Sequence, residues 1–293
     1  MTSKSKDQAI KLLLSIGVVV SAATTLAILA MLLKETVVFF KLVSISEFFF
    51  GRVWEPLIEP KQFGVAPLVV GTLMISFGSI ALAVPLGIFT AVYLSEVASE
   101  RLRSFLKPVL ELLAGIPTVV YGYFAITFIT PLLRDFIPDL EIFNALSASV
   151  VVAIMILPMI ASLCDDAFRA LPRSLKEGAY ALGATPNEVM FGVLLPASRG
   201  RVVAAIMLAL SRAAGETMAV TLAAGSTPNL DFNFLGSVQT MTAFIVQMSL
   251  GDVATGGVEY LSSFAVGALL FVITLILNGI GTYMIFKAPK GVA

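Results

Sequence analysis

Long apolar runs separated by short charged stretches make up most of this chain. A run of about 20 apolar residues is long enough to cross a bilayer as a helix. Such runs lie at about 12–33, 68–94, 109–133, 148–164, 202–224 and 261–286. The pattern predicts an all-α integral membrane protein with six spans. We expect a short N-terminal arm, 1–11, followed by one transmembrane domain over 12–293.

The first apolar run has two possible interpretations. Lys4, Lys6 and Lys11 resemble the basic start of a secretory signal peptide, and small residues follow at Ser21–Ala23. The apolar run continues beyond that point to Leu33, which favours a retained membrane anchor.

The segment at 34–67 mixes charge with many aromatic side chains. Aromatic residues are enriched where a membrane meets water, so we expect this segment to lie at the headgroup level. Its aromatic residues are Phe39, Phe40, Phe48, Phe49, Phe50 and Trp54.

The placement of Lys and Arg predicts the orientation of the spans. Cytoplasmic loops of membrane proteins carry an excess of these residues. Of the 19 in this chain, thirteen lie in the arm, the tail and the loops at 95–108 and 165–201, against five in the opposite loops. Both termini and the 165–201 loop are therefore predicted to be cytoplasmic.

Composition narrows the possible functions. The chain is 58% hydrophobic with a mean hydropathy of +0.97, and its formal net charge of zero offers no basic surface for nucleic acid. It has no histidine and one cysteine, Cys164, so the sequence offers no catalytic residues and no metal site. No GxxxxGK[ST] phosphate-binding loop occurs, so the chain itself is not expected to bind ATP.

One loop contains a compact polar module, KEGAYALGATPNEVMFGVLLP, at 176–196. Ser174 and Glu177 have the spacing of a capping box that would open a first helix. Gly183 suits the left-handed residue that ends a helix. Thr185 with Glu188 predicts a second capping box, so two short helices would meet at a glycine. We interpret this hairpin as a docking surface, with an unpartnered amphipathic hairpin as the alternative.

The same residues resemble the EAA loop of ABC-importer permeases. The family pattern is Glu-Ala-Ala, three residues, Gly, nine residues, Ile, one residue, Leu-Pro. The matching positions here are Glu177, Gly178, Ala179, Gly183, Val193, Leu195 and Pro196, with mild departures at Gly178 and Val193. The resemblance implies a coupling helix that fits a groove on a cytoplasmic ATPase subunit, which would hold the ATP and Mg²⁺.

Arg212 and Glu216 are the charged residues deepest in a predicted span. Ionisable side chains in the membrane face partners or water, because exposure to lipid is costly. On a continuous helix these two would be neighbours on one face, and either an anion path or a structural salt bridge would explain them. Nearby hydroxyls at Ser211, Thr217 and Thr221 would line the path or bond their own backbone. Small residues predicted on the Arg212 side are Ala205, Ala209, Gly215, Ala219 and Ala223.

Several segments resemble the phosphate-importer permeases of the PstC type: GETMAVTLAAG with the preceding Arg212, VYGYF, AVPLGIFTAVYLSE and VQTMTAFI. The resemblance implies a type I importer permease of the bacterial cytoplasmic membrane, with phosphate passing Arg212 and Glu216. It also implies a PstA-type second permease, PstB-type ATPase subunits and a PstS-type extracytoplasmic phosphate-binding protein. Another oxyanion such as sulfate is the alternative substrate. A secondary anion transporter is the alternative class, and the sequence shows no convincing inverted repeat to support it.

Overall fold

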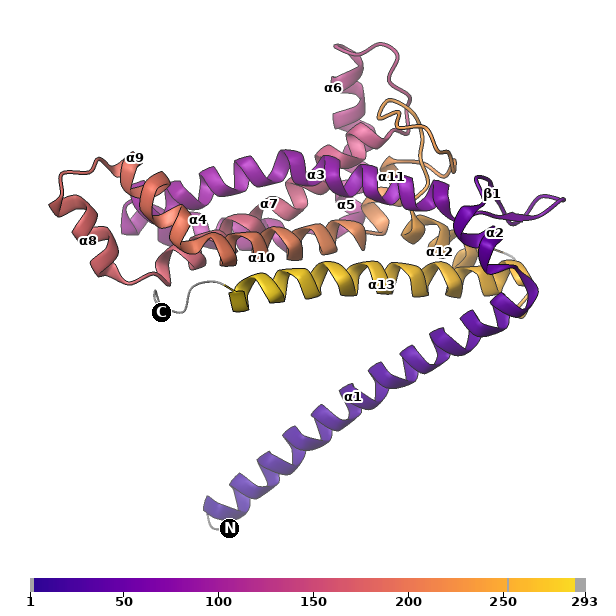
Figure 1. Ribbon diagram of the computed structural model, residues 1–293, viewed down its shortest axis with the longest axis horizontal. Coiled ribbons are helices and arrows are strands. Elements are labelled where there is room, and N and C mark those ends of the chain that lie inside the picture. The colour runs from indigo at the N-terminus through magenta and orange to yellow at the C-terminus, as the bar shows by residue number, and fades with distance from the viewer. Residues whose placement is uncertain (1–2, 252, 288–293) are drawn as a thin grey trace.

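The computed structural model describes residues 3–251 and 253–287, which form a bundle of long helices (Figure 1). Five helices contain segments long and apolar enough to cross a membrane, and one bent pair supplies a sixth. The five are α1 (Ser3–Leu42), α3 (Ala66–Val92), α7 (Ala145–Arg169), α10 (Leu195–Ala214) and α13 (Val258–Lys287). The predicted all-α membrane fold is confirmed. The predicted arm 1–11 is described from residue 3, and the predicted tail lies outside the described residues beyond Lys287.

Shorter elements connect these helices. At one end of the bundle lie α2 (Ile45–Phe50), the antiparallel strands β1 (Trp54–Glu55) and β2 (Gln62–Phe63), and α12 (Met241–Leu250). The π-helix η1 (Tyr93–Val97) extends α3, and α11 (Met218–Ala223) follows α10. A hairpin of α8 (Arg173–Ala181), α9 (Pro186–Glu188) and the π-helix η3 (Val189–Leu194) stands at the opposite end from the strands (Figure 1).

The third span is bent. The predicted boundaries, a loop at 95–108 and a span at 109–133, do not match the helices of the structure. Instead α4 (Glu100–Ala114) is followed, after a break, by α5 (Thr118–Phe124), the π-helix η2 (Ala125–Ile129) and α6 (Thr130–Arg134), at 85° to α4. Ser99 starts α4 early by accepting a hydrogen bond from the Leu102 N–H, at 3.3 Å. Pro117 disfavours helical backbone at Ile116, so the helix breaks there, and Figure 1 shows α6 projecting away from the bundle.

Small residues let α3 and α7 pack closely at the centre of the bundle. A Cβ atom built on Gly87 of α3 would lie 2.6 Å from a side-chain carbon of Ile160 on α7. A Cβ on Gly78 would lie 2.7 Å from the Ser149 hydroxyl. Real Cβ atoms do not approach so closely, so these two glycines set the distance between the helices, as small residues do in membrane bundles.

An aromatic cluster closes the end of the bundle that carries the strands. Phe39, Phe48 and Trp54 are almost completely buried, and their rings meet edge-to-face with one another, with Phe63 or with Phe244. These three side chains therefore pack within the protein and do not face lipid, while the headgroup level of the segment stays a prediction. That prediction was made from composition, which does not show that α12 returns to cover them. Phe49 and Phe50 are exposed, as the prediction requires.

An ion pair joins the β1–β2 hairpin to α13. Lys61, between β1 and β2, forms an ion pair with Glu259 at 2.5 Å and another with Glu59 at 3.2 Å. Hydrogen bonds to these carboxylates raise the pKa of Lys61 above its usual value.

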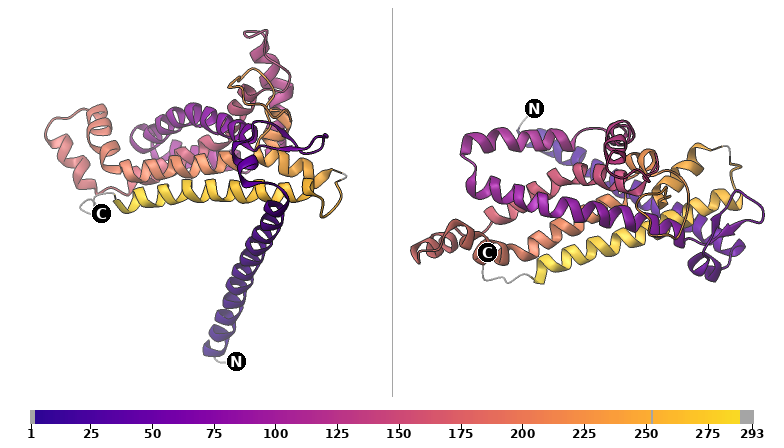
Figure 2. Two further views of the ribbon diagram at one scale, coloured as in Figure 1. Left: turned by 45° about the vertical axis from the view of Figure 1, so that its right-hand side comes forward. Right: turned by 90° about the horizontal axis from the view of Figure 1, so that it is seen from above.

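Helix α1 leaves the bundle. The C-terminal end of α1 packs on α13, where the Thr36 hydroxyl donates to the Phe264 carbonyl at 3.1 Å. From there it diverges, as Figures 1 and 2 show, and its apolar 18-residue window is 0% buried. A length of apolar helix that is exposed on every side is suited to lipid or to another membrane protein.

Candidate functional site

The hairpin between α7 and α10 has the predicted glycine elbow. Gly183 ends α8 with a φ of +83°, in the left-handed region that favours glycine. The Ala184 N–H donates to the Ala179 carbonyl at 3.1 Å, and the Gly183 N–H to the Tyr180 carbonyl at 2.9 Å. These hydrogen bonds satisfy the last carbonyls of α8 and fix the direction in which α9 starts.

One of the two predicted capping boxes is present. The Thr185 N–H donates to the Glu188 carboxylate at 2.7 Å, and the Glu188 N–H donates to the Thr185 hydroxyl at 3.4 Å. The box at Ser174 and Glu177 is wrong, because Pro172 is the N-cap and Ser174 already lies inside the first turn. Proline lacks an N–H and is tolerated where a helix begins. The N-cap of α8 is therefore two residues earlier in the chain than predicted.

The tip of the hairpin presents apolar surface to solvent. Leu182 is 91% exposed, and Tyr180 is also exposed. Glu177, Gly178 and Gly183 share this exposure. An isolated, fully exposed leucine at the end of a rigid turn is suited to insertion into a partner's groove. The motif spacing predicted a role for Gly183 but none for Leu182. Leu182 is identified by the exposure of its side chain in the structure.

The other predicted coupling residues form the base of the hairpin. Ala179 and Leu195 are partly buried and pack against the main hydrophobic core. Pro196 lies in the first turn of α10, where a missing N–H costs nothing. The structure thus divides the predicted set into an exposed tip and a base that continues into a membrane helix.

Two charged contacts tie the hairpin region to neighbouring helices. Lys176 of α8 forms an ion pair with Glu96 of η1. Deeper in the bundle, Asp165 of α7 is 0% exposed and contacts Arg103 at 2.6 Å, Arg169 at 3.4 Å and Lys107 at 3.7 Å. The partners of Asp165 come mainly from α4, about 60 residues earlier in the chain.

The fifth predicted span is a broken helix. The continuous helix predicted over 202–224 is wrong, because α10 ends at Ala214 and α11 begins at Met218. Glu216 lies in the break and is 8% exposed. Its carboxylate accepts a hydrogen bond from the Ala219 N–H at 3.2 Å, and its carbonyl accepts one from the Thr242 hydroxyl at 2.7 Å. Glu216 therefore caps α11.

Arg212 and Glu216 are not brought together as an ion pair. Arg212 is exposed on the last turn of α10, whereas Glu216 is buried, and no ion pair joins them within the part of the chain that the structure describes. The predicted stripe is also divided. Arg212 and Gly215 are exposed, and the alanines of the set, Ala205, Ala209, Ala219 and Ala223, are buried. The pairing assumed a continuous helical periodicity that stops at Gly215.

The hydroxyls around the break bond chiefly to local backbone. Thr217 donates to the Gly215 carbonyl at 3.1 Å, and Thr221 donates to the Thr217 carbonyl at 2.7 Å. Ser211 is buried in the last turn of α10. Each bond uses the single hydroxyl hydrogen of its threonine, so the hydroxyl oxygen can still accept a hydrogen bond but cannot donate another.

Solved structures with the same arrangement define the class of fold. The chain aligns with a subunit of a bacterial alginate ABC transporter at a TM-score of 0.64, with 17% identity over 98% of this chain and 99% of that one. It aligns with the MetNI methionine ABC transporter at a TM-score of 0.57, with 19% identity over 78% of this chain and 95% of that one. The fold is that of a type I ABC-importer permease.

Sequence comparison identifies the family. Residues 83–287 match the model of the binding-protein-dependent transport system inner membrane component, and the chain belongs to this family. A probable ABC transporter permease protein of Bacillus subtilis, YqgH, is 35% identical over 80% of this chain and 75% of its own. The phosphate transport system permease protein PstC of Pasteurella multocida is 35% identical over 84% of this chain and 83% of its own. The PstC of Mesorhizobium japonicum is 34% identical over 82% and 78%.

Proposed function

We propose that this chain is the permease subunit of an ATP-driven importer for inorganic phosphate. The observation that carries the proposal is the exposed hairpin with its glycine elbow, in a family member whose relatives include phosphate permeases. A permease without its own ATP site needs such a contact to receive energy from an ATPase. ATP and Mg²⁺ would be bound by PstB-type partner subunits, and a PstS-type binding protein would deliver phosphate from outside.

The orientation in this proposal has the hairpin in the cytoplasm of a bacterial cell, with both termini on the same side. Closure of two ATPase subunits would then draw two hairpins together and open the outer side of the permeases. The rigid base at Leu195 and Pro196 would pass this movement directly into α10, which carries Arg212 at its other end. Transport would proceed by alternating access.

Arg212 is the proposed contact for the passing anion. Its guanidinium is exposed at the break between α10 and α11, in a span whose neighbouring residues are largely buried. Guanidinium groups match the oxygens of tetrahedral oxyanions in a two-pronged manner and stay charged at physiological pH. Glu216 would help to shape this break as the cap of α11, since it does not pair with Arg212 here.

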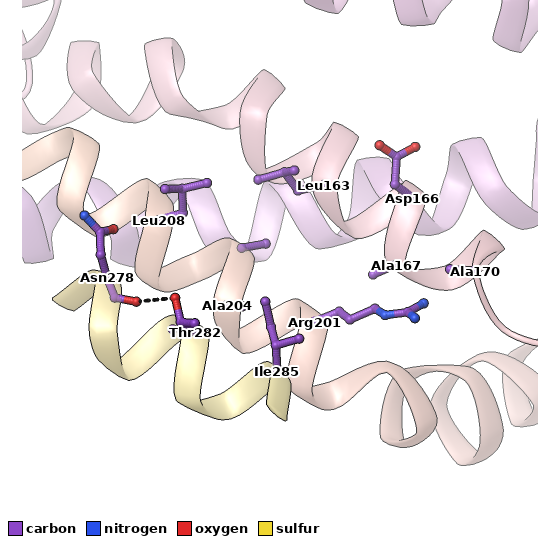
Figure 3. A pocket seen from close by; sticks show the side chains of 12 residues that line it. Leu163, Asp166, Ala167, Ala170, Arg201, Ala204, Leu208, Asn278, Thr282 and Ile285 are labelled. Carbon is purple, nitrogen blue, oxygen red and sulfur yellow. Dashed lines mark hydrogen bonds between the residues drawn. The ribbon is translucent and has the colours of Figure 1, made fainter. Parts of the chain in front are cut away.

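Two exposed features support a second permease subunit, which we propose to be of the PstA type. The first is the unpacked apolar length of α1. The second is a cavity of about 490 Å³ between α7, α10 and α13 (Figure 3). Its wall includes the small residues Ala167, Ala204 and Gly281, which leave room for a helix. A partner subunit would cover both.

The test is uptake of labelled phosphate into membrane vesicles that contain this chain, a PstA-type permease and the ATPase. The binding protein is added outside, and unlabelled sulfate serves as the competitor. We expect uptake that requires ATP and that excess sulfate does not reduce. Uptake without ATP would indicate a secondary transporter, and uptake suppressed by sulfate would keep the importer and change its substrate.

A further inference from the structure

A cavity of about 760 Å³ with several polar side chains in its lining lies beside the C-terminal end of α11, between the end of α6 and the connection from α11 to α12. Its lining includes one arginine, Arg134, and four hydroxyl residues, Thr221, Ser226, Thr227 and Ser237. This combination differs from the apolar cavity of Figure 3. It offers charge and hydrogen bonds, whereas the other offers mainly hydrocarbon contact.

Arg134 is the charged donor of this cavity and is not neutralised by a carboxylate. It lies in the last turn of α6, and within residues 3–251 and 253–287 it forms no ion pair. Glu141 also lines the cavity, but one of its carboxylate oxygens accepts a hydrogen bond from the Ser237 N–H at 3.0 Å. That hydrogen bond leaves the Glu141 carboxylate charged, so it repels an anion in the cavity while Arg134 attracts it. The guanidinium forms no ion pair among the described residues and is available to bind the anion.

The floor of the cavity is built by the backbone at Gly225. This residue has a φ of +89°, and a Cβ atom built on it would overlap the Ser237 hydroxyl and lie 3.1 Å from Phe143. Only glycine permits this close approach. The turn brings Ser226 and Thr227 to the same wall as Ser237, whose hydroxyl donates to Thr227 at 3.1 Å.

The cavity lies one helical turn from the proposed anion path. Thr221, which lines it, donates to the carbonyl of Thr217 in the helix break next to Glu216. A group released from the cavity toward the bundle therefore meets α11 and then the break. Arg134 and Arg212 would act in sequence, one at each end of this short helix.

We infer that this cavity is an entry site for an inorganic oxyanion such as phosphate, with Arg134 as its charged donor and the Ser226 and Thr227 hydroxyls as further donors. The inference rests on the proposed function, and it adds a site outside the span that contains Arg212. An anion leaving the binding protein would be held here before it reaches Arg212.

Protection of an engineered cysteine tests occupancy directly. Ser226→Cys is introduced into the assembled transporter, where the natural Cys164 is buried and gives little background. Maleimide labelling is timed without ATP, with and without millimolar phosphate and with chloride as the salt control. We expect phosphate, and not chloride, to slow labelling severalfold. Equal labelling rates in phosphate and chloride would overturn the inference.

Two charge variants supply the controls. Arg134→Ala should remove the protection, because the loss of one charge-assisted hydrogen bond lowers the affinity for an anion by about tenfold or more. Glu141→Gln removes a negative charge from the same cavity and should lower the phosphate concentration for half-protection. Protection that persists in Arg134→Ala, or that Glu141→Gln weakens, would contradict the assignment.

A parallel arm separates free phosphate from a lipid headgroup. Dihexanoyl phosphatidylglycerol is added in detergent solution in place of phosphate. Protection by the lipid alone would assign the cavity to headgroups and overturn the inference. Uptake by the same preparation keeps the two proposals distinct. ATP-driven phosphate uptake without protection refutes only the entry site, whereas absent uptake refutes the proposed function.

Discussion

Arg212 is the residue on which the proposed path depends most. Arg212→Ala removes an exposed guanidinium and leaves no buried partner unpaired, since the described residues give it no ion pair. We therefore expect assembly to persist and ATP-driven uptake to be lost. Arg212→Lys keeps the charge without the two-pronged geometry and should retain a fraction of the uptake.

The measurement is vesicle uptake together with co-purification of the partner subunits. Normal uptake by the alanine variant would show that Arg212 is not part of the path. A variant that fails to co-purify would instead show that Arg212 holds the assembly together.

At this scale, local sequence predicts local chemistry well. The Thr185 and Glu188 box and the left-handed Gly183 depend on residues within one turn, and both predictions are confirmed. The Arg212–Glu216 pairing and the helix over 202–224 depend on other helices and on the continuity of a span. Neither property is encoded in the spacing of a few neighbouring residues, and both predictions failed.

Among the elements, the hairpin elbow provides a matched pair of substitutions. Gly183→Val places a β-branched side chain at a φ of +83°, which costs about 1–2 kcal/mol for a non-glycine residue. Space is not the obstacle, because nothing lies within 4 Å of a Cβ built there. We expect α9 to be redirected and ATP-driven uptake to fall severalfold.

Gly178→Ala is the control for the elbow. This position is equally open but lies inside α8, where alanine favours a helix by about 0.5–1 kcal/mol relative to glycine. Uptake and ATPase association should stay normal in this variant and fall together in Gly183→Val. Equal behaviour of the two variants would argue against a specific role for the elbow.

The Lys176–Glu96 ion pair connects the hairpin to the end of α3. Glu96 is 9% exposed in its side chain, so removing Lys176 leaves a buried carboxylate unpaired, at a cost of about 1–3 kcal/mol. We expect Lys176→Ala and Glu96→Lys each to reduce coupling of ATP hydrolysis to uptake. The reversed pair, Lys176→Glu with Glu96→Lys, should restore part of it.

The readout is the number of phosphate ions imported per ATP hydrolysed. A double variant as impaired as the singles would mean that the contact is incidental to coupling.

Element boundaries show the limits of an apolar pattern. The positions of five long helices could be predicted because each needs only enough consecutive apolar residues. The bend of 85° after α4 and the break after α10 could not. The bend lies at Gly115 and Pro117, and the break lies at Gly215. Residues of these types are compatible with a kink, a break or a straight helix, and packing against neighbouring helices decides which of the three forms.

For the whole molecule, the unpacked α1 makes a prediction about assembly. A photo-crosslinking residue at Leu26, which is 66% exposed, should form an adduct with a second permease subunit in the complete transporter. The same residue at Phe39, which is fully buried, should crosslink only within the chain. Adducts with lipid alone at Leu26 in the complete transporter would contradict a helix partner.

The buried carboxylate of Asp165 has a consequence for how the protein is made. A buried charge that has lost its partner is strongly destabilising, and the main partners of Asp165 lie on α4, which is synthesised before α7. Arg103 and Lys107 must therefore already be in position when Asp165 enters the membrane. In a nascent chain whose third span has inserted wrongly, Asp165 would stay unpaired. Such a chain would be a substrate for the proteases that degrade misassembled membrane proteins.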